Sequence, residues 1–153
     1  MNICTIGGSG FVGTPLITLL RDDSTVLNID KAPSAHHREL TQTADVREPE
    51  SLTALLAHQD VVILLAAEHR DDVSPASLYY DVNVKGTKNV LKKMDKIGIK
   101  NLVFTSSVAI YGLNKANPNE NHQKDPFNHY GKSKWQAELI IRSWFDSDPI
   151  NKS

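Results

Sequence analysis

Residues 7–13 read Gly7-Gly8-Ser9-Gly10-Phe11-Val12-Gly13, between an apolar run at 2–6 and a helical pattern that begins near residue 11. The stretch satisfies both Gly-x-Gly-x-x-Gly and Gly-x-x-Gly-x-x-Gly, in the order strand, turn and helix. One glycine permits the tight turn, another lets the backbone approach a pyrophosphate, and Gly13 lets the helix pack close to the strand. Backbone N–H groups near Phe11 and Val12 would face the anion, assisted by the helix dipole. We therefore predict a dinucleotide-binding turn with Gly7, Gly10 and Gly13 at its centre.

A carboxylate follows the next expected strand, 25–29. Asp30 lies seventeen residues beyond Gly13, near the spacing at which an acidic residue binds the ribose of a dinucleotide. Asp30 would accept hydrogen bonds from both ribose hydroxyls and repel a 2′-phosphate, so it favours NAD over NADP. Lys31, the next residue, would attract that phosphate and keeps NADP open as an alternative.

Apolar runs alternate with helical patterns along the whole chain. The runs lie at 2–6, 25–29, 40–43, 60–66 and 100–105, and helices are expected at 11–21, 50–57, 75–97 and 128–145. Such alternation predicts a parallel sheet with helices on both faces. A polar loop is expected between residues 112 and 127. The predicted fold class is α/β, a Rossmann-type doubly wound sheet of about five strands in one domain, residues 1–153.

Composition excludes several classes of protein. The formal net charge of −1 offers no basic surface for nucleic acid, and the longest apolar run, 61–67, is too short to cross a bilayer. The N-terminus lacks the pattern of a secretory signal, and the single cysteine, Cys4, is expected to be buried. The histidines show no metal-ligand spacing and are expected to be solvated. We therefore expect a cytoplasmic protein with no metal, no nucleic-acid partner and no membrane segment.

A Tyr-x-x-x-Lys pattern falls on the last expected helix, where its spacing puts Tyr130 and Lys134 on one face. A free phenol titrates at about pH 10, so a tyrosine serves as a base near neutrality only beside a positive charge. Lys134 and an oxidised nicotinamide would supply that charge. The hydroxyls of residues 105–107 follow the strand at 100–105, at the sheet edge where α/β proteins bind ligands.

Several segments together resemble a known family. The segments TIGGSGFVG (5–13), LLAA (64–67), NVKGTKNV (83–90), TSSVAIYG (105–112) and YGKSK (130–134) occur in the order and approximate spacing of the extended short-chain dehydrogenase/reductases. More narrowly, the chain resembles the NAD-dependent epimerase/dehydratase branch that acts on nucleotide sugars. The resemblance extends from Asn2 to about residue 143.

The resemblance implies a role for each residue at a matching position. Ser107 is similar to the family's active-site Ser/Thr, Tyr130 to its acid/base and Lys134 to its cofactor-binding lysine. The cofactor would also be lined by Asp45 and Val46, which reach the adenine, and by Leu65, Ala66 and Ala67. Asn83 resembles a helix residue that supports the active-site network. Alternatively, Asp45 caps a loop and Asn83 is a hydrogen-bonded core amide.

The implied reaction is epimerisation at a sugar carbon. NAD would abstract a hydride, Tyr130 would take the hydroxyl proton, and Ser107 would hydrogen-bond that oxygen. Return of the hydride to the other face gives the epimer. Val108 and Ala109 differ from the Asp-Glu pair of the family's dehydratases, which disfavours dehydration. The implied substrate is a nucleotide sugar, a UDP-sugar first, and the implied assembly is a homodimer through the helices at 75–97 and 128–145.

Family members are usually much longer and carry a C-terminal region that closes over the nucleotide sugar. We expect that substrate domain to be absent here. Two hypotheses stay open: the cofactor-binding part of a nucleotide-sugar epimerase, or a non-catalytic dinucleotide-binding module that associates with another chain through its sheet edge. An unpaired edge predicts self-association or marginal stability in either case.

Overall fold

The computed structural model describes residues 1–113 and 115–153 and contains a five-stranded parallel sheet. Its strands are β1 (Asn2–Ile6), β2 (Thr25–Asp30), β3 (Thr41–Thr43), β4 (Val61–Leu64) and β5 (Asn101–Phe104), in the spatial order β3-β2-β1-β4-β5. The α/β class and the five strands are confirmed. The fourth strand is shorter than predicted, because the N–H groups of Leu65 and Ala66 both donate to Ile6 O, at 2.8 and 2.7 Å, and turn the chain.

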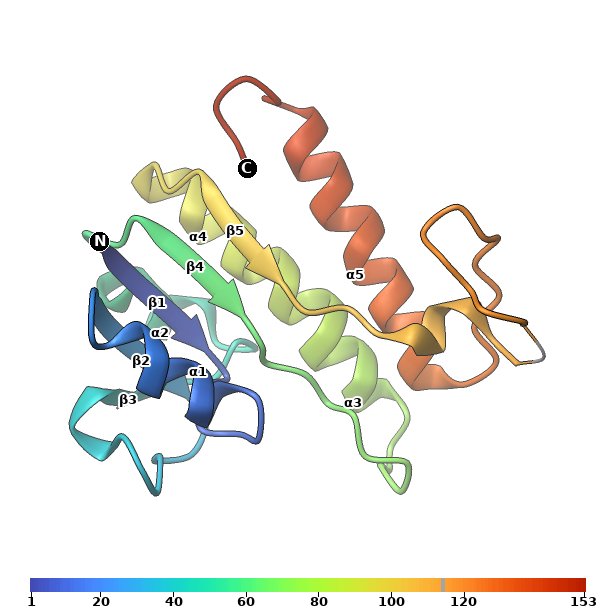
Figure 1. Cartoon of the computed structure of the whole chain (residues 1–153), viewed down its shortest axis with the longest axis horizontal. Helices are drawn as coiled ribbons and strands as arrows, with labels where there is room; N and C mark the ends of the chain where they lie inside the picture. The colour runs from blue at the N-terminus through green and yellow to red at the C-terminus, as the bar shows by residue number, and fades with distance from the viewer. Residues whose placement is uncertain (114) are drawn as a thin grey trace.

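Helices cover the two faces of the sheet unequally. The helices are α1 (Gly13–Leu20), α2 (Pro49–Leu55), α3 (Ser77–Tyr80), α4 (Thr87–Ile97) and α5 (His129–Asp146), with short 3-10 turns η1 (Arg38–Leu40) and η3 (Val108–Tyr111). Helix α2 contacts α4, and α4 contacts α5, so these three form one layer, whereas α1 lies against β2 on the opposite face (Figure 1). The exposed side of β5 carries Val103, which is 51% exposed.

The helix predicted at 75–97 is continuous, but its middle is a π-helical segment, η2 (Asp81–Gly86), between α3 and α4. The segment buries Asn83, Val84 and Gly86. Such bulges are frequent at functional sites because they redirect one side chain of a helix. The helix ends at Gly98, as predicted, with φ of +82° and its N–H on Met94 O.

The main core lies between the sheet and the layer of α2, α4 and α5. It contains Cys4, Ile6, Ile29, Ala44, Val46, Leu52, Leu56, Val62, Leu64, Val90, Leu91, Met94, Ile99 and Trp144. Cys4 is fully buried, as expected, and burial raises the pKa of its thiol to about 12. Trp144, from α5, packs in this core and is 8% exposed. The position of this core leaves the carboxyl ends of the strands free to form a ligand site.

One histidine contradicts the prediction that all histidines are solvated. His37 is buried, and its Nε2 lies 3.0 Å from Thr14 O and 3.1 Å from Thr18 Oγ1. The cause is a turn in which Ser34 Oγ accepts the His37 N–H at 3.1 Å and folds the loop over α1. Within residues 1–113 and 115–153, no cluster of side chains suits a metal ion. The helices of the same described residues include none long and apolar enough to cross a membrane.

Candidate functional site

A pocket of about 740 Å³ opens at the carboxyl ends of β1, β2 and β4. Strand β1 lies between β2 and β4, so the chain order reverses there, and ligands of open α/β sheets bind at such a switch point. The lining includes Gly7, Gly10, Phe11, Val12, Gly13, Asp30, Lys31, Asp45, Val46, Leu65, Ala66, Ala67, Tyr130 and Lys134. The structure thus brings together, on one cavity, every predicted cofactor-binding residue except Asn83.

The glycines of the turn serve different purposes. Gly7 has φ of +88°, and a Cβ there would lie 2.4 Å from Ala66 N. A Cβ on Gly13 would lie 2.3 Å from the Cα of Gly8, so the start of α1 packs directly on the turn. Gly10 is different, because its Cβ would meet only Gly7 O, at 3.9 Å. The space beside Gly10 is an open cradle in the pocket wall that a side chain would fill and a diphosphate fits.

The residues that follow Gly10 leave donors free. The side chain of Phe11 is 96% exposed and that of Val12 56% exposed. Within the part of the chain that the structure describes, the N–H groups of these two residues donate to no other group, and α1 has no side-chain cap. Free N–H groups at the positive end of a helix attract anions. The turn therefore fits the pyrophosphate of a dinucleotide.

Asp30 is held by the backbone on both of its oxygens. Its Oδ2 accepts the Ser9 N–H at 2.9 Å, and its Oδ1 accepts the Ala32 N–H at 3.1 Å. The Lys31 ammonium lies 3.9 Å from the carboxylate of Glu68, an acidic residue after β4 that was not predicted as a site residue. Both acidic residues line the pocket.

Asp45 forms a bidentate pair with a neighbour. Its carboxylate accepts from Arg47 Nε and Nη2 at 3.0 and 2.6 Å. The hydrogen bond from Arg47 lowers the pKa of Asp45. Val46 is buried and backs the wall, where a Cβ on Gly86 would lie 2.6 Å from Val46 Cγ2. Asp45 and Val46 both line the pocket, and Asp45 Oδ1 also accepts the Arg47 N–H at 2.9 Å, as a residue that caps a loop does.

Tyr130 and Lys134 reach the pocket from the first turns of α5. Asn128 caps this helix by accepting the Gly131 N–H at 2.8 Å. The Lys134 ammonium is buried, donates to Thr105 O at 2.6 Å, and lies 4.0 Å from the centre of the Phe104 ring. Burial lowers the pKa of Lys134 to about 8. A cation of low hydration thus lies one helical turn from the phenol.

Ser107 is not among the residues that line the pocket, although Thr105 and Ser106 are. Its Oγ accepts the Ala109 N–H at 3.2 Å and so caps η3. The hydroxyl hydrogen of Ser107 is not used in this contact and stays able to donate. Ser106 donates instead to Glu138 on α5.

Asn83 lies behind the pocket and connects two of its walls. Its amide exchanges hydrogen bonds with the Glu68 backbone, at 2.8 and 2.9 Å, and donates to Ser133 Oγ at 2.8 Å. Ser133 in turn donates to Tyr130 O at 2.8 Å. Asn83 is therefore a hydrogen-bonded core amide that also supports the site. Ser133 was missed because a serine between two lysines carries no separate signal.

Asn28 was also missed, although an amide within the apolar strand TVLNID is a detectable signal. It is fully buried under the glycine-rich turn and accepts the Gly8 N–H at 2.9 Å.

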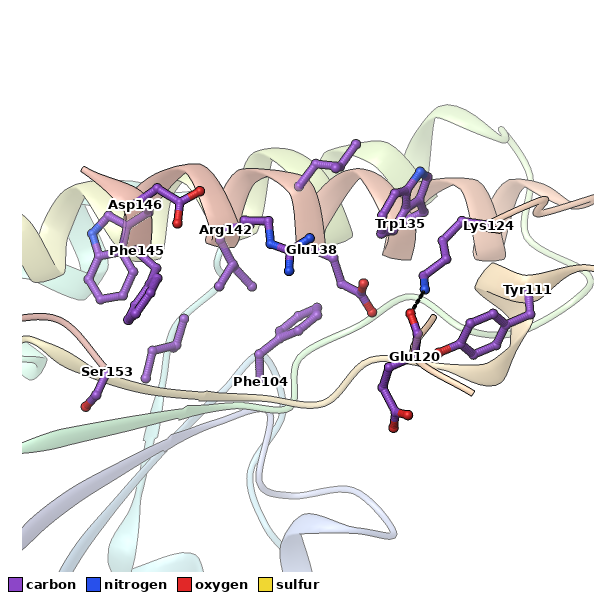
Figure 2. A pocket seen from close by; sticks show the side chains of 14 residues that line it. Phe104, Tyr111, Glu120, Lys124, Trp135, Glu138, Arg142, Phe145, Asp146 and Ser153 are labelled. Atoms are coloured by element: carbon purple, nitrogen blue, oxygen red, sulfur yellow. Dashed lines mark hydrogen bonds between the residues drawn. The ribbon is translucent and has the colours of Figure 1, made fainter. Parts of the chain in front are cut away.

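A second hollow, of about 570 Å³, lies between β5 and α5 (Figure 2). We call it the β5–α5 groove, and it is lined by Leu102, Phe104, Tyr111, Glu120, Lys124, Trp135, Glu138, Leu139, Ile141, Arg142, Trp144, Phe145, Asp146 and Ser153. Trp135, from α5, is one of the aromatic residues of this groove. At one end of the groove, Figure 2 shows Lys124 between Tyr111 and Trp135. Phe145 lies at the opposite end. Ser153 pairs with the free edge of β5, since its N–H donates to Lys100 O and its carbonyl accepts from Leu102, at 2.9 and 2.7 Å.

The chain is similar to known sugar epimerases. A family model described as the NAD dependent epimerase/dehydratase family matches residues 3–151. An N-acetyl-alpha-D-glucosaminyl-diphospho-ditrans,octacis-undecaprenol 4-epimerase of Escherichia coli O157:H7 is 59% identical over 152 residues, which are 99% of this chain and 46% of the relative. A UDP-glucose 4-epimerase of Lactobacillus helveticus is 31% identical over 157 residues, covering 95% of this chain and 47% of the relative.

A solved structure agrees in fold. The UDP-glucose 4-epimerase of Bifidobacterium longum, in complex with NAD+ and UDP, superposes with a TM-score of 0.86 at 28% identity, over 97% of this chain and 50% of that one. The chain spans about half the length of the curated relatives it matches.

Proposed function

The chain belongs to the NAD-dependent epimerase/dehydratase family, and from this premise we propose that it is the cofactor-binding and proton-transfer part of a sugar 4-epimerase. The observation that carries the proposal is the single cavity on which the glycine-rich turn, Asp30, Tyr130 and Lys134 meet. It joins donors for a pyrophosphate, a carboxylate for a ribose and a tyrosine for proton transfer. The NAD-binding domain would span residues 1–153.

In this proposal the chain's own residues bind the cofactor and move one proton. A bound NAD would supply the hydride acceptor and donor for the sugar carbon. Tyr130 takes the proton of the sugar hydroxyl and gives it back. Lys134, charged below a pKa of about 8, stabilises the resulting phenolate and gives up its bond to Thr105 O to bind the cofactor. Ser107 donates its free hydrogen to the reacting oxygen.

We propose a sugar linked through a diphosphate as the substrate, with N-acetylglucosamine on an undecaprenyl carrier ahead of a UDP-sugar. The higher identity to the lipid-linked 4-epimerase than to the UDP-glucose 4-epimerase supports this order. The absence of an acidic pair at Val108 and Ala109 supports epimerisation over dehydration. The proposed assembly is a homodimer through the continuous helix of α3, η2 and α4 and through α5, in a cytoplasmic setting without nucleic acid.

A second candidate function is a dinucleotide-binding module that pairs with another chain. The pairing of Ser153 with β5 and the apolar lining of the β5–α5 groove favour it. Both candidates bind NAD, but only the first transfers protons.

The test is a calorimetric titration with NAD and NADP, followed by 4-epimerase assays. The assays use UDP-N-acetylglucosamine and undecaprenyl-diphosphate N-acetylglucosamine, with the chain alone and with the C-terminal part of the Escherichia coli relative added. We expect NAD binding by the chain alone and turnover of the lipid-linked substrate in the mixture. Tyr130→Phe should reduce turnover about 100-fold or more while NAD affinity stays unchanged.

Each outcome separates the candidates. Binding of NAD without turnover in any mixture supports the module. A folded chain without NAD affinity would overturn both candidates.

A further inference from the structure

We propose that Asn28 is a positioning residue that makes the site select NAD over NADP, because it holds Ser9 and, through Ser9, the carboxylate of Asp30. The inference rests on the proposed function and deepens it. It assigns cofactor choice to a buried amide that cannot touch the cofactor.

Asn28 lies at the centre of β2 and uses its whole hydrogen-bonding capacity. Its Oδ1 accepts from Gly8 N at 2.9 Å and from Thr5 Oγ1 at 3.1 Å. Its Nδ2 donates to Ser9 Oγ at 3.1 Å and to Thr41 Oγ1 at 3.0 Å. An amide offers two donors and two acceptor lone pairs, so none is left over. A fully satisfied buried network of this kind fixes the groups that it joins.

Ser9 passes this constraint to Asp30. Its N–H donates to Asp30 Oδ2 at 2.9 Å, and its hydroxyl donates to Ala32 O at 3.1 Å. The Ala32 N–H returns to Asp30 Oδ1 at 3.1 Å. Ser9, Asp30 and Ala32 therefore close a ring of hydrogen bonds, and Asn28 anchors the ring to the sheet.

A carboxylate in such a ring has one orientation. Each oxygen of Asp30 keeps a lone pair for a ribose hydroxyl, so the diol of NAD finds its acceptors already placed. A 2′-phosphate would meet a negative charge that cannot rotate aside. Once the ring is loosened, the carboxylate can turn to solvent, and Lys31, with a side chain 67% exposed, can approach the phosphate.

The experiment compares dissociation constants for NAD and NADP, by calorimetry on the full chain, in the wild type and in Asn28→Val. We expect the preference for NAD to fall about tenfold, as loss of one well-placed hydrogen bond allows. A residue that only stabilised the fold would weaken both cofactors equally and leave their ratio unchanged. Ser9→Ala removes the hydroxyl links from a half-buried position and should shift the ratio in the same direction, so it carries the test if Asn28→Val does not fold.

Two further variants locate the effect. Thr41→Val cuts the bond from Asn28 to β3 and leaves its bond to Ser9, so the ratio should stay at the wild-type value. In an Asp30→Ala background, Asn28→Val should add no further change, because the carboxylate that it positions is gone. An unchanged ratio in Asn28→Val and Ser9→Ala would overturn this inference alone, whereas a wild type without NAD affinity would overturn the proposed function as well.

Discussion

The cofactor pocket and the β5–α5 groove differ in what closes them. At the pocket and directly beneath it, polar groups are hydrogen-bonded to one another, as the four bonds of the buried Asn28 and the two of the half-buried Asp30 illustrate. The groove is lined by aromatic and aliphatic side chains together with five charged ones, and it lies beside the edge of β5, with which Ser153 pairs. The chain thus fixes the polar groups around the first hollow by its own hydrogen bonds, whereas the second hollow lies beside a strand edge of the kind that another polypeptide segment covers.

The largest loss of stability should come from Gly7→Ala, which places a methyl group against the backbone that forms the pocket wall. The substitution combines a positive φ with a Cβ 2.4 Å from the Ala66 backbone, so it should lower the free energy of unfolding by about 3 kcal/mol or more. Gly98→Ala is the matched control, because its φ of +82° is similar but no atom lies within 4 Å. It should cost about 1 kcal/mol, from the left-handed backbone alone. Equal losses in denaturant titrations would refute the crowding at Gly7.

Gly10→Val tests the pocket as a ligand site rather than as part of the fold. Because the space beside Gly10 is open, the variant should unfold at nearly the wild-type temperature. The added side chain fills the cradle proposed for the pyrophosphate, so NAD affinity should fall on the order of 100-fold. Calorimetry and thermal unfolding on the same preparation check both halves. If this variant bound NAD as tightly as the wild type, the space beside Gly10 would not be part of the NAD site.

Lys134→Met tests the cost of a charge buried for function. The folded-state pKa of about 8 lies below the ordinary 10.5, so the folded chain binds fewer protons than the unfolded chain between these values. Stability of the wild type should therefore rise as pH increases from about 8 to 10.5. The methionine variant should lack this rise and should be more stable at pH 7 by about 1 kcal/mol. Urea titrations between pH 7 and 10.5 measure the free energy of unfolding of both proteins. The same change of this free energy with pH in the two proteins would contradict the prediction.

The same lysine should make cofactor binding depend on pH. If its positive charge binds NAD, affinity should be constant below pH 8 and should weaken as pH rises through about 8. The methionine variant should bind more weakly and without this dependence. A wild-type affinity that stays constant up to pH 10 would show that Lys134 does not act through its charge.

Sequence predicted the cofactor pocket far better than the β5–α5 groove, and for a physical reason. The pocket depends on local rules: Gly7 to Gly13 form a turn, and Asp30 ends a strand. Both features can be recognised from residues that lie close together in the sequence. Glu68 and Ser133 were missed because their roles depend on Asn83, which lies 15 and 50 residues away and which only the fold brings near.

The third helix and His37 show the same limit. The helical spacing of apolar side chains predicted one helix over 75–97. It did not reveal the π-helical segment around Asn83, whose side chain is hydrogen-bonded to Glu68 and Ser133. A histidine in a polar loop is normally solvated, yet His37 is covered because the turn at Ser34 lays the loop on α1. Tertiary contacts decided both outcomes.

The smallest expected effect concerns the groove and the outer edge of β5. Exposed aromatic and aliphatic side chains beside a strand edge that Ser153 pairs only in part should make the chain self-associate, which sedimentation at several concentrations measures. Leu139 lines the groove and is 47% exposed, so Leu139→Lys should weaken the association constant by about tenfold or less. Leu19→Lys is the control, since Leu19 is 72% exposed on α1, on the other face of the sheet. If both variants weakened the association equally, exposed apolar residues in general, and not the groove, would cause it. A wild type that stays monomeric at high concentration would contradict the prediction itself, because the groove would then be stable in water without a cover.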